Sequence, residues 1–218
     1  MLALPKMFLA TALAVAVFLL SGCSQPSPST SAATSTSDVT TAKASEPSTT
    51  EPVTAKTAYL EMYRSAYKWS PDVVLLGLKP SDKSGFPFDA GKSGLWEATF
   101  ASPSKHEYLV FTYAIAAHSP DIYKGVTVGN SVTWGGETRD VMPIAASDFT
   151  VDSDAAYKAA AAGAEAWIKK NPGKKLTAFQ LGNGYSFPSP VWYVVWGDKK
   201  AGGYVAFVNA STGELMKK

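Results

Sequence analysis

The chain has 218 residues, a formal net charge of +2, and 46% apolar and 12% aromatic residues. Its lysines form no run longer than two, as in "GKK" and "GDKK", whereas a nucleic-acid-binding face needs clustered lysine and arginine. The composition therefore argues against a nucleic-acid partner. Cys23 is the only cysteine, which excludes a disulfide within the chain.

Residues 1–22 have the pattern of an export signal. Lys6 supplies the positive charge, "MFLATALAVAVFLL" the apolar stretch, and Ser21 and Gly22 the small residues that follow it. The apolar stretch has fourteen residues, and a membrane-spanning helix needs about 20. We predict a signal peptide over residues 1–22 rather than a transmembrane helix.

The end of this stretch, "LSGC" at residues 20–23, resembles a bacterial lipobox. The resemblance implies cleavage before Cys23, diacylglycerol on the Cys23 sulfur and usually a third acyl chain on the new amine. Two or three acyl chains anchor a protein stably in a membrane, so membrane lipid is the first partner implied. The alternative is an ordinary secretory signal followed by an incidental cysteine.

The next segment consists mainly of serine, threonine, alanine and proline, and it holds no aromatic residue. Such a segment cannot bury enough apolar surface to offset its conformational entropy. We predict that residues 23–56 comprise the lipidated cysteine and a disordered tether, whose root-mean-square reach is on the order of 30 Å. The folded part then begins near Thr57, because every tryptophan and tyrosine lies beyond the tether.

Residues 57–149 are predicted to form a first repeat, a helix followed by three strands. "TAYLEMYRSAYKW" is amphipathic, and Ser70-Pro71 ends it. The strands are expected at 72–79, 94–102 and 106–116, with "SPSK" as a hairpin turn. The apolar helix positions are Leu60, Met62, Tyr63, Ala66 and Tyr67.

Two further segments follow the third strand. "VTVGNSVTW" at 126–134 is interpreted as an extra hairpin around Gly129-Asn130 or as one bent edge strand. "DVMPIA" at 140–145 fits another edge strand, because Pro143 would be tolerated only there. The first repeat is therefore longer than a helix and three strands require.

Residues 150–218 carry the clearer copy of the same order. Asp152 or Ser153 caps a helix whose last turn holds Lys169 and Lys170, and "NPG" ends it. Three short strands rich in β-branched and aromatic residues follow, at 175–182, 190–197 and 203–210. The apolar face of the helix is formed by Tyr157, Ala160, Ala161, Ala164, Trp167 and Ile168.

The two halves share an aromatic pattern. At a separation of 96 residues, with no gap, the matches are Trp96 with Trp192, Phe100 with Trp196, Tyr108 with Tyr204, and Phe111 with Phe207. At 98 residues the matches are Trp69 with Trp167 and Leu78 with Leu176. The loss of two residues within one loop is what duplication followed by drift leaves. Chance similarity between two strand pairs is the alternative.

The second copy resembles the PepSY domain, found in propeptides of bacterial metalloproteases and in cell-envelope proteins. The resemblance rests on "WIKKNPG", "WYVVWG" and "YVAFVNASTGELMKK". The family commonly has Asp-Ala-x-Thr-Gly-Glu here, and Asn209 replaces its aspartate. The first copy keeps only the order of helix and strands. The resemblance implies a small α+β fold used for binding, often linked to the regulation of peptidases. It does not imply catalysis.

The strand "VWYVVWG" is apolar on both faces. Alternation places Trp192 and Trp196 on one face and Tyr193 on the other. One face should meet its own helix, so the other needs a cover as well. The sister copy is one candidate, packing sheet to sheet or extending one sheet across a pseudo-twofold axis. An exposed aromatic groove for a peptide or glycan is the other.

The residues indicate no catalytic, cofactor or metal site. His106 and His118 have no partner at metal-ligand spacing. "AGKSG" at 90–94 lacks the upstream glycine of a phosphate loop and leads into a predicted strand. Folding could still bring together two carboxylates, as a glycosidase needs, but the sequence selects no pair. The acids at predicted caps and turns are Asp148, Asp152, Asp154 and Asp198.

We therefore predict an α+β protein of two repeats, each a helix followed by an antiparallel meander of three to four strands, with the sheets packed together or continuous. We expect a non-enzymatic binding module without a cofactor, anchored through Cys23 to the outer face of the cytoplasmic membrane or to the outer membrane. Beyond lipid, the expected partner is an envelope protein or peptide, and one such role is restraint of a peptidase. The alternatives are an assembly component of the envelope and an envelope hydrolase with dispersed carboxylates.

Overall fold

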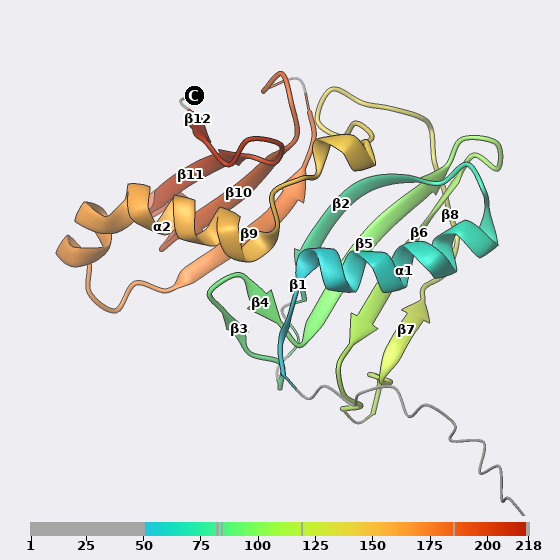
Figure 1. The fold of residues 1–218 in the computed structure, drawn as a ribbon, viewed down its shortest axis with the longest axis horizontal. Helices are drawn as coiled ribbons and strands as arrows, with labels where there is room; N and C mark the ends of the chain where they lie inside the picture. Colours follow the sequence, from blue (N-terminus) through green and yellow to red (C-terminus); the bar gives the residue numbers. More distant parts are fainter. Residues whose placement is uncertain (1–50, 82, 84, 119, 185, 217–218) are drawn as a thin grey trace, which may run out of the picture. The chain divides into compact units, whose positions relative to one another are not determined.

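The computed structural model describes residues 51–216 except 82, 84, 119 and 185 (Figure 1). The predicted signal peptide, Cys23 and most of the tether lie outside the described residues. Strand β1 (Val53–Thr54) and helix α1 (Ala55–Trp69) come first. The folded part therefore starts at Val53, and the assignment of residues 53–56 to the tether is wrong.

The main strands and the second helix follow in the predicted order, accompanied by short strands and 3-10 turns that the sequence did not predict. The first half continues with β2 (Val74–Pro80), β3 (Phe88–Asp89), β4 (Lys92–Ser93), β5 (Leu95–Ser102), β6 (Glu107–Ala114), β7 (Gly125–Val128) and β8 (Val132–Thr133). The second half has a short 3-10 helix (Ala146–Asp148), α2 (Ser153–Lys170), β9 (Leu176–Gly182), β10 (Val191–Trp196), a 3-10 turn (Lys199–Ala201), β11 (Tyr204–Asn209) and β12 (Leu215–Met216).

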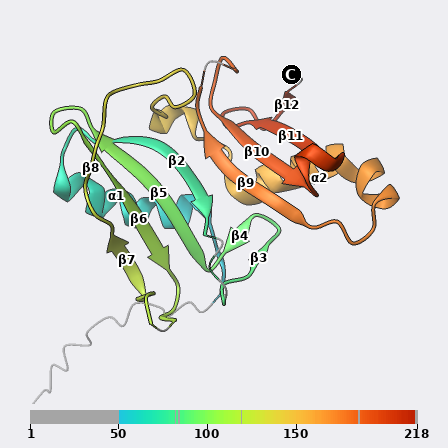
Figure 2. The same ribbon diagram turned by 180° about the vertical axis from the view of Figure 1, so that it is seen from behind.

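One antiparallel sheet runs through both halves. Its strand order is β12-β11-β10-β9-β2-β5-β6-β7, with β8 also paired to β6, and β1, β4 and β3 form a separate small sheet. Each half thus contributes a four-stranded meander, and the two meanders meet at β9 and β2. Both helices lie on one face of the sheet (Figure 1), and the view from behind shows the other face without a helix (Figure 2). The α+β fold class is confirmed, with continuous sheets.

Each helix buries one stripe of side chains, mostly alanines, against its own meander. In α2 the buried residues include Ala156, Ala160 and Ala164, and Lys169 and Lys170 occupy the last turn as predicted. In α1 they include Ala58, Met62 and Ala66. The four-residue spacing keeps them on one helical face. Small side chains there let the helix backbone approach the sheet closely.

The prediction that Leu60 and Tyr67 belong to the buried face of α1 is wrong. Leu60 is 53% exposed and Tyr67 is 52% exposed. Both lie outside the buried stripe of α1, which is narrower than the apolar pattern of the sequence suggests.

Strand pairing gives the true correspondence between the halves. Trp96 lies opposite Pro80 and Tyr113, whereas Trp192 lies opposite Leu181 and Val208. With Trp96 matched to Trp192 at a separation of 96 residues, the residues opposite them are separated by different numbers. Pro80 and Leu181 of the first strands are 101 residues apart, and Tyr113 and Val208 of the third strands are 95 apart. The first strand also carries a bulge at the same place in both halves, after Leu75 and after Leu176.

Several predicted matches are therefore wrong by a few residues. Leu176 corresponds to Leu75 rather than to Leu78, since both precede the bulge. The second hairpin is one residue shorter than the first, and a shift of one residue moves a side chain to the other face of a sheet. Phe111 accordingly packs under α1, whereas Phe207 contacts Tyr193 and Phe187 on the opposite face.

The same indole hydrogen bond occurs in each half. Trp96 Nε1 donates to the carbonyl oxygen of Val53, and Trp192 Nε1 donates to that of Val151, both at 3.0 Å. Both tryptophans are fully buried, and a buried indole N–H needs an acceptor. Each tryptophan thereby ties the middle of its meander to the segment just before its helix.

The helix N-termini of the two halves meet. The α1 N-cap residue, Thr54, makes no capping bond with its side chain. Instead, the Ala55 amide donates to Ser153 Oγ at 2.8 Å, and the Lys56 amide donates to Asp152 Oδ1 at 3.0 Å. Asp152 also accepts from the Ser153 amide at 2.7 Å. The second half therefore caps both helices.

Aromatic side chains make the core under the helices continuous across the two halves. Phe149 packs against Tyr59 of α1 at 5.6 Å and against Trp192 of β10 at 5.8 Å between ring centroids. From the first half, Phe88 of β3 reaches Phe179 of β9 at 5.0 Å. The halves thus share one core, although each helix covers its own strands.

Joining the sheets edge to edge determines what covers their second face. Gly77 and Leu78 of β2 pair with Gly182 and Leu181 of β9, so the sister copy extends the sheet and does not lie over it. The helix-free face of the first half is crossed instead by the segment after β8. Of the two alternatives for residues 126–134, the bent edge strand is confirmed, because β7 and β8 both pair with β6.

The segment "DVMPIA" forms less structure than predicted. Ile144 makes a single antiparallel bridge with Leu75, and the rest of the segment is not a strand.

Ser153→Ala is expected to lower the free energy of unfolding by about 1–3 kcal/mol. The substitution leaves the buried Ala55 amide without an acceptor. Urea denaturation monitored by circular dichroism measures the loss. Ser147→Ala, at an exposed serine of the neighbouring 3-10 helix, is the control, and an equal effect of the two substitutions would contradict the shared cap.

Candidate ligand-binding groove

The two histidines lie in separate local settings. His106 is an exposed residue of the β5–β6 turn with a φ of 53°. The His118 ring packs edge-on against Phe86, with 5.8 Å between ring centroids. Among the described residues no group of three or more His, Cys, Asp or Glu side chains could hold a metal ion. The predicted lack of a cofactor and of catalysis stays a prediction.

The acids predicted at caps and turns serve local structure. Asp154 Oδ1 accepts from the Ala155 amide, and Asp198 Oδ1 accepts from the Lys200 amide, both at 2.8 Å. Asp148 accepts from the Ser147 hydroxyl at 3.3 Å. Each of these carboxylates therefore accepts a hydrogen bond from a residue of its own turn or helix start.

The turn that carries the PepSY resemblance is also structural. Asn209 Oδ1 accepts from the Ser211 amide at 2.8 Å and from the Thr212 amide at 3.0 Å. Gly213 has a φ of 79°, in the left-handed region that favours glycine. An aspartate would accept the same two bonds. Asn209 additionally donates from Nδ2 to Ser189 Oγ at 3.0 Å.

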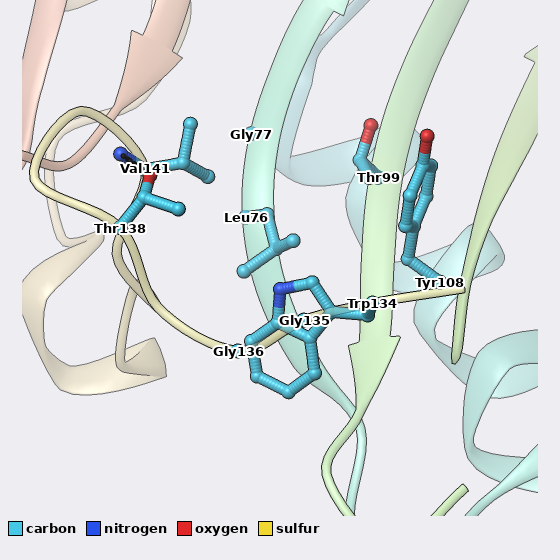
Figure 3. Close-up of a pocket in the computed structure, with 9 residues that line it drawn as sticks. All are labelled: Leu76, Gly77, Thr99, Tyr108, Trp134, Gly135, Gly136, Thr138 and Val141. Carbon is cyan, nitrogen blue, oxygen red and sulfur yellow. Dashed lines mark hydrogen bonds between the residues drawn. The ribbon is translucent and has the colours of Figure 1, made fainter. Parts of the chain in front are cut away.

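A cavity of about 510 Å³ lies on the helix-free face of the first half (Figure 3). Its floor consists of Leu76 and Gly77 at the β2 bulge and of Thr99 on β5. Tyr108 of β6 lines one side, and Figure 3 shows Trp134 beside Leu76. Leu76 is buried, whereas Tyr108 and Trp134 are half-buried, so aromatic surface faces the cavity and remains open to solvent.

The cavity is roofed by residues 134–143, which we call the strap. At one end the Trp134 amide donates to the His106 carbonyl oxygen at 2.8 Å. At the other end the Met142 amide donates to the Asn183 carbonyl oxygen, and Asn183 Nδ2 donates to the Pro143 carbonyl oxygen at 2.7 Å. The strap is therefore held by the β5–β6 turn and by the loop after β9, which belong to different halves.

Between these attachments the strap contains two adjacent glycines with open surroundings. A Cβ added at Gly135 or Gly136 would meet nothing within 4 Å, and Gly136 has a φ of 96°. Two adjacent glycines in open space allow large backbone rotations at low cost. No side chain of the described residues packs around the strap backbone at these two glycines.

A second cavity of about 400 Å³ adjoins the first at the junction of the halves. The two share Leu76, Gly77, Thr99 and Val141, and together we call them the groove. The second part is polar. Lys79 Nζ lies 3.5 Å from Glu97 Oε2, and Ser81 Oγ donates to Glu97 Oε1 at 2.6 Å. Its other polar lining residues are Asp140, Gln180 and Asn183.

The groove is thus elongated and amphipathic. Its aromatic end suits an apolar group, and its polar end offers amides, a lysine and two carboxylates. Glu97 and Asp140 are the carboxylates that folding brings into one cavity, a juxtaposition that the sequence did not select. Lys79 and Ser81 hold the Glu97 carboxylate in place, an arrangement typical of a carboxylate with a structural role.

Marked pKa shifts occur outside the groove. The Ser70 hydroxyl, the Ser104 amide and the Ser102 hydroxyl donate to Asp72 and hold the pKa of its carboxyl well below the usual range. Burial, reinforced by the neighbouring Tyr63, raises the pKa of the Tyr59 hydroxyl. Asp72 fastens the end of α1 to the β5–β6 turn, and Tyr59 belongs to the core.

Sequence reasoning missed Trp134, Tyr108 and Leu76 as site residues. One signal was present for Trp134. It lies between the two copies and has no counterpart in the other half, whereas Trp69, Trp96, Trp167 and Trp192 fall in pairs. Because Trp134 is outside the pattern shared by the two halves, packing in a shared core does not explain its presence.

No model of a known protein family matches the chain, and no curated protein matches its sequence. A crystal structure described as a "putative lipoprotein" from Clostridium difficile 630 aligns with a TM-score of 0.45 and 12% sequence identity. The alignment covers 78% of this chain and 95% of the other. In the part of the chain that the structure describes, no helix is long and apolar enough to cross a membrane.

Asp72→Asn is expected to destabilise the protein at neutral pH and to have a smaller effect in acid. The folded-state pKa of Asp72 lies below its unfolded value of about 3.9. The carboxylate's contribution is therefore present above about pH 4 and is lost as the pH falls through the folded pKa. Urea denaturation at about pH 7 and about pH 3 measures the difference. Asp89→Asn, at an exposed position of β3, is the control. A pH-independent effect at Asp72 would contradict this role.

Proposed function

We propose that the protein is a membrane-anchored lipoprotein of the cell envelope that acts as a non-catalytic binding module and holds an extended peptide in the groove. The observation that carries the proposal is the groove itself, placed on the sheet face that no helix covers and bridged by a strap with two glycines in open space. The anchor is the acylated Cys23 predicted from the lipobox.

The chemistry of the groove fits a peptide in extended conformation. A side chain of the ligand would pack between Trp134, Leu76 and Val141, which line its apolar end. The main chain would continue toward Gln180 and Asn183, whose amide groups both donate and accept hydrogen bonds. Binding sites of this kind combine an apolar lining with a few placed polar groups.

A peptide ligand also connects the groove with the family resemblance. An extended segment of an envelope peptidase is a ligand of the proposed class, and holding it would restrain that enzyme. The tether would keep the module at the membrane surface while leaving it free to reach a neighbouring protein.

The experiment selects ligands from a randomised heptapeptide library with the chain from residue 24 onward, and measures their affinity by calorimetry. Trp134→Ala is expected to weaken the selected peptides at least about tenfold, because it removes the aromatic wall of the apolar end. Tyr67→Ala, at an exposed aromatic residue on α1, is the matched control and should leave the affinity unchanged.

Two results would contradict the proposal. One is equal binding to the Trp134 variant and the wild type, and the other is the failure of any peptide to be enriched. Mass spectrometry of the bound peptide separates binding from catalysis, because a hydrolase using Glu97 and Asp140 would return cleaved products. Intact peptide supports the binding module.

A further inference from the structure

Six lysines gather at one end of the second half. They come from three separate places in the sequence: the last turn of α2, the loop before β9, and the turn between β10 and β11. All six are exposed. We call this group the lysine tip, and its members are Lys169, Lys170, Lys174, Lys175, Lys199 and Lys200.

Short contacts hold the three segments together. The Gly197 amide donates to the Lys175 carbonyl oxygen at 2.8 Å, which joins the loop before β9 to the turn after β10. A Cβ added at Gly197 would come within 3.3 Å of the Trp167 ring and 3.7 Å of the Lys174 side chain. Trp167, in the last turns of α2, also packs against Tyr204 at the start of β11. The lysine pairs are therefore neighbours in space.

Most of this positive charge has no local partner. Within the described residues, Lys169 alone of the six forms an ion pair, with Glu165 at 2.7 Å. Asp198, the other acid in these segments, accepts the Lys200 amide with one carboxylate oxygen. Lys199 lies over the Tyr193 ring, 5.7 Å from its centroid. The segments thus carry six lysines against two acids.

The rest of the described chain has the opposite balance. Outside the lysine tip and its two acids, it contains ten lysines and arginines and thirteen aspartates and glutamates. The small net charge of the whole chain therefore hides an uneven distribution, in which the lysine tip is basic and the rest of the described chain is acidic. The helix dipole accounts for lysines in the last turn of α2, but not for the four that come from turns.

We propose that the lysine tip docks on the anionic phospholipid surface of the membrane to which the protein is tethered. A lysine held at an anionic surface contributes about 1 kcal/mol, and a basic patch is the kind of second signal that reinforces a lipid anchor. The predicted tether keeps the tip within reach of that surface, and so raises its effective concentration there.

Docking through the tip leaves the groove free. The tip belongs to the end of α2 that lies away from β2 and β5 (Figure 1), which with the strap build the aromatic end of the groove. The lysine tip would therefore orient the module on the membrane. This inference rests on the membrane anchor of the proposed function, but it uses different residues from the groove, so tip docking and peptide binding can fail separately.

The experiment measures vesicle binding by the unacylated chain from residue 24 onward, which removes the lipid anchor and keeps the whole folded part. Vesicles contain phosphatidylcholine alone or with about 40% phosphatidylglycerol, at ionic strengths of about 0.05 and 0.5 M. Co-sedimentation is expected only with phosphatidylglycerol and only at low salt. Replacing five tip lysines by glutamine (K170Q, K174Q, K175Q, K199Q and K200Q) should weaken binding at least about tenfold.

A charge-matched variant decides whether the position of the lysines matters. Five lysines outside the tip are replaced by glutamine (K68Q, K83Q, K92Q, K124Q and K158Q), and circular dichroism verifies that both variants fold. Binding by this control within about twofold of the wild type supports docking through the tip. An equal loss in both variants, or binding to phosphatidylcholine alone, would overturn it. So would retention on immobilised polyphosphate or DNA without vesicle binding, which would assign the tip to a soluble polyanion.

Discussion

The shared cap between the two helix N-termini is the contact on which the rest of the structure depends. Two helix starts, each with unpaired amides and a partial positive charge, would repel one another. Asp152 and Ser153 resolve this by accepting amides from both helices. Because each helix lies on its own meander, fixing their starts also fixes the two meanders side by side. The sheets can then join through β2 and β9, with Phe149 filling the space between them.

Edge-to-edge joining has a consequence for function. It leaves one face of a long sheet without helices, and the first half covers part of that face with the strap. The strap is attached to both halves, so the groove beneath it requires the union of the repeats. A single repeat would lack either the β2 floor or the Asn183 attachment. The groove is therefore a feature that neither half has alone.

The sequence predicted the elements well and the relation between them less well. Periodicity and turn residues placed the helices and the main strands within a few residues, because those signals are local. The correspondence was wrong by three residues at Leu78, because the loops between the helix and the first strand differ in length. It was wrong by one residue at Tyr108 and Phe111, where one residue lost in a turn reverses the face of a strand. The groove could not be predicted, because Leu76, Tyr108 and Trp134 meet only after three strands and the strap assemble. The lysine tip was missed for the same reason, as its pairs are distant in sequence.

Native-state hydrogen exchange of the Asp152→Ala variant tests most directly whether the two halves form one cooperative unit. Slowly exchanging amides of β5 report on the first half, and those of β10 report on the second. The shared cap predicts one global unfolding free energy for both strands in the wild type, and an equal decrease in both strands of the variant. A decrease confined to β10, with β5 unchanged, would show that the halves unfold independently and would contradict the account.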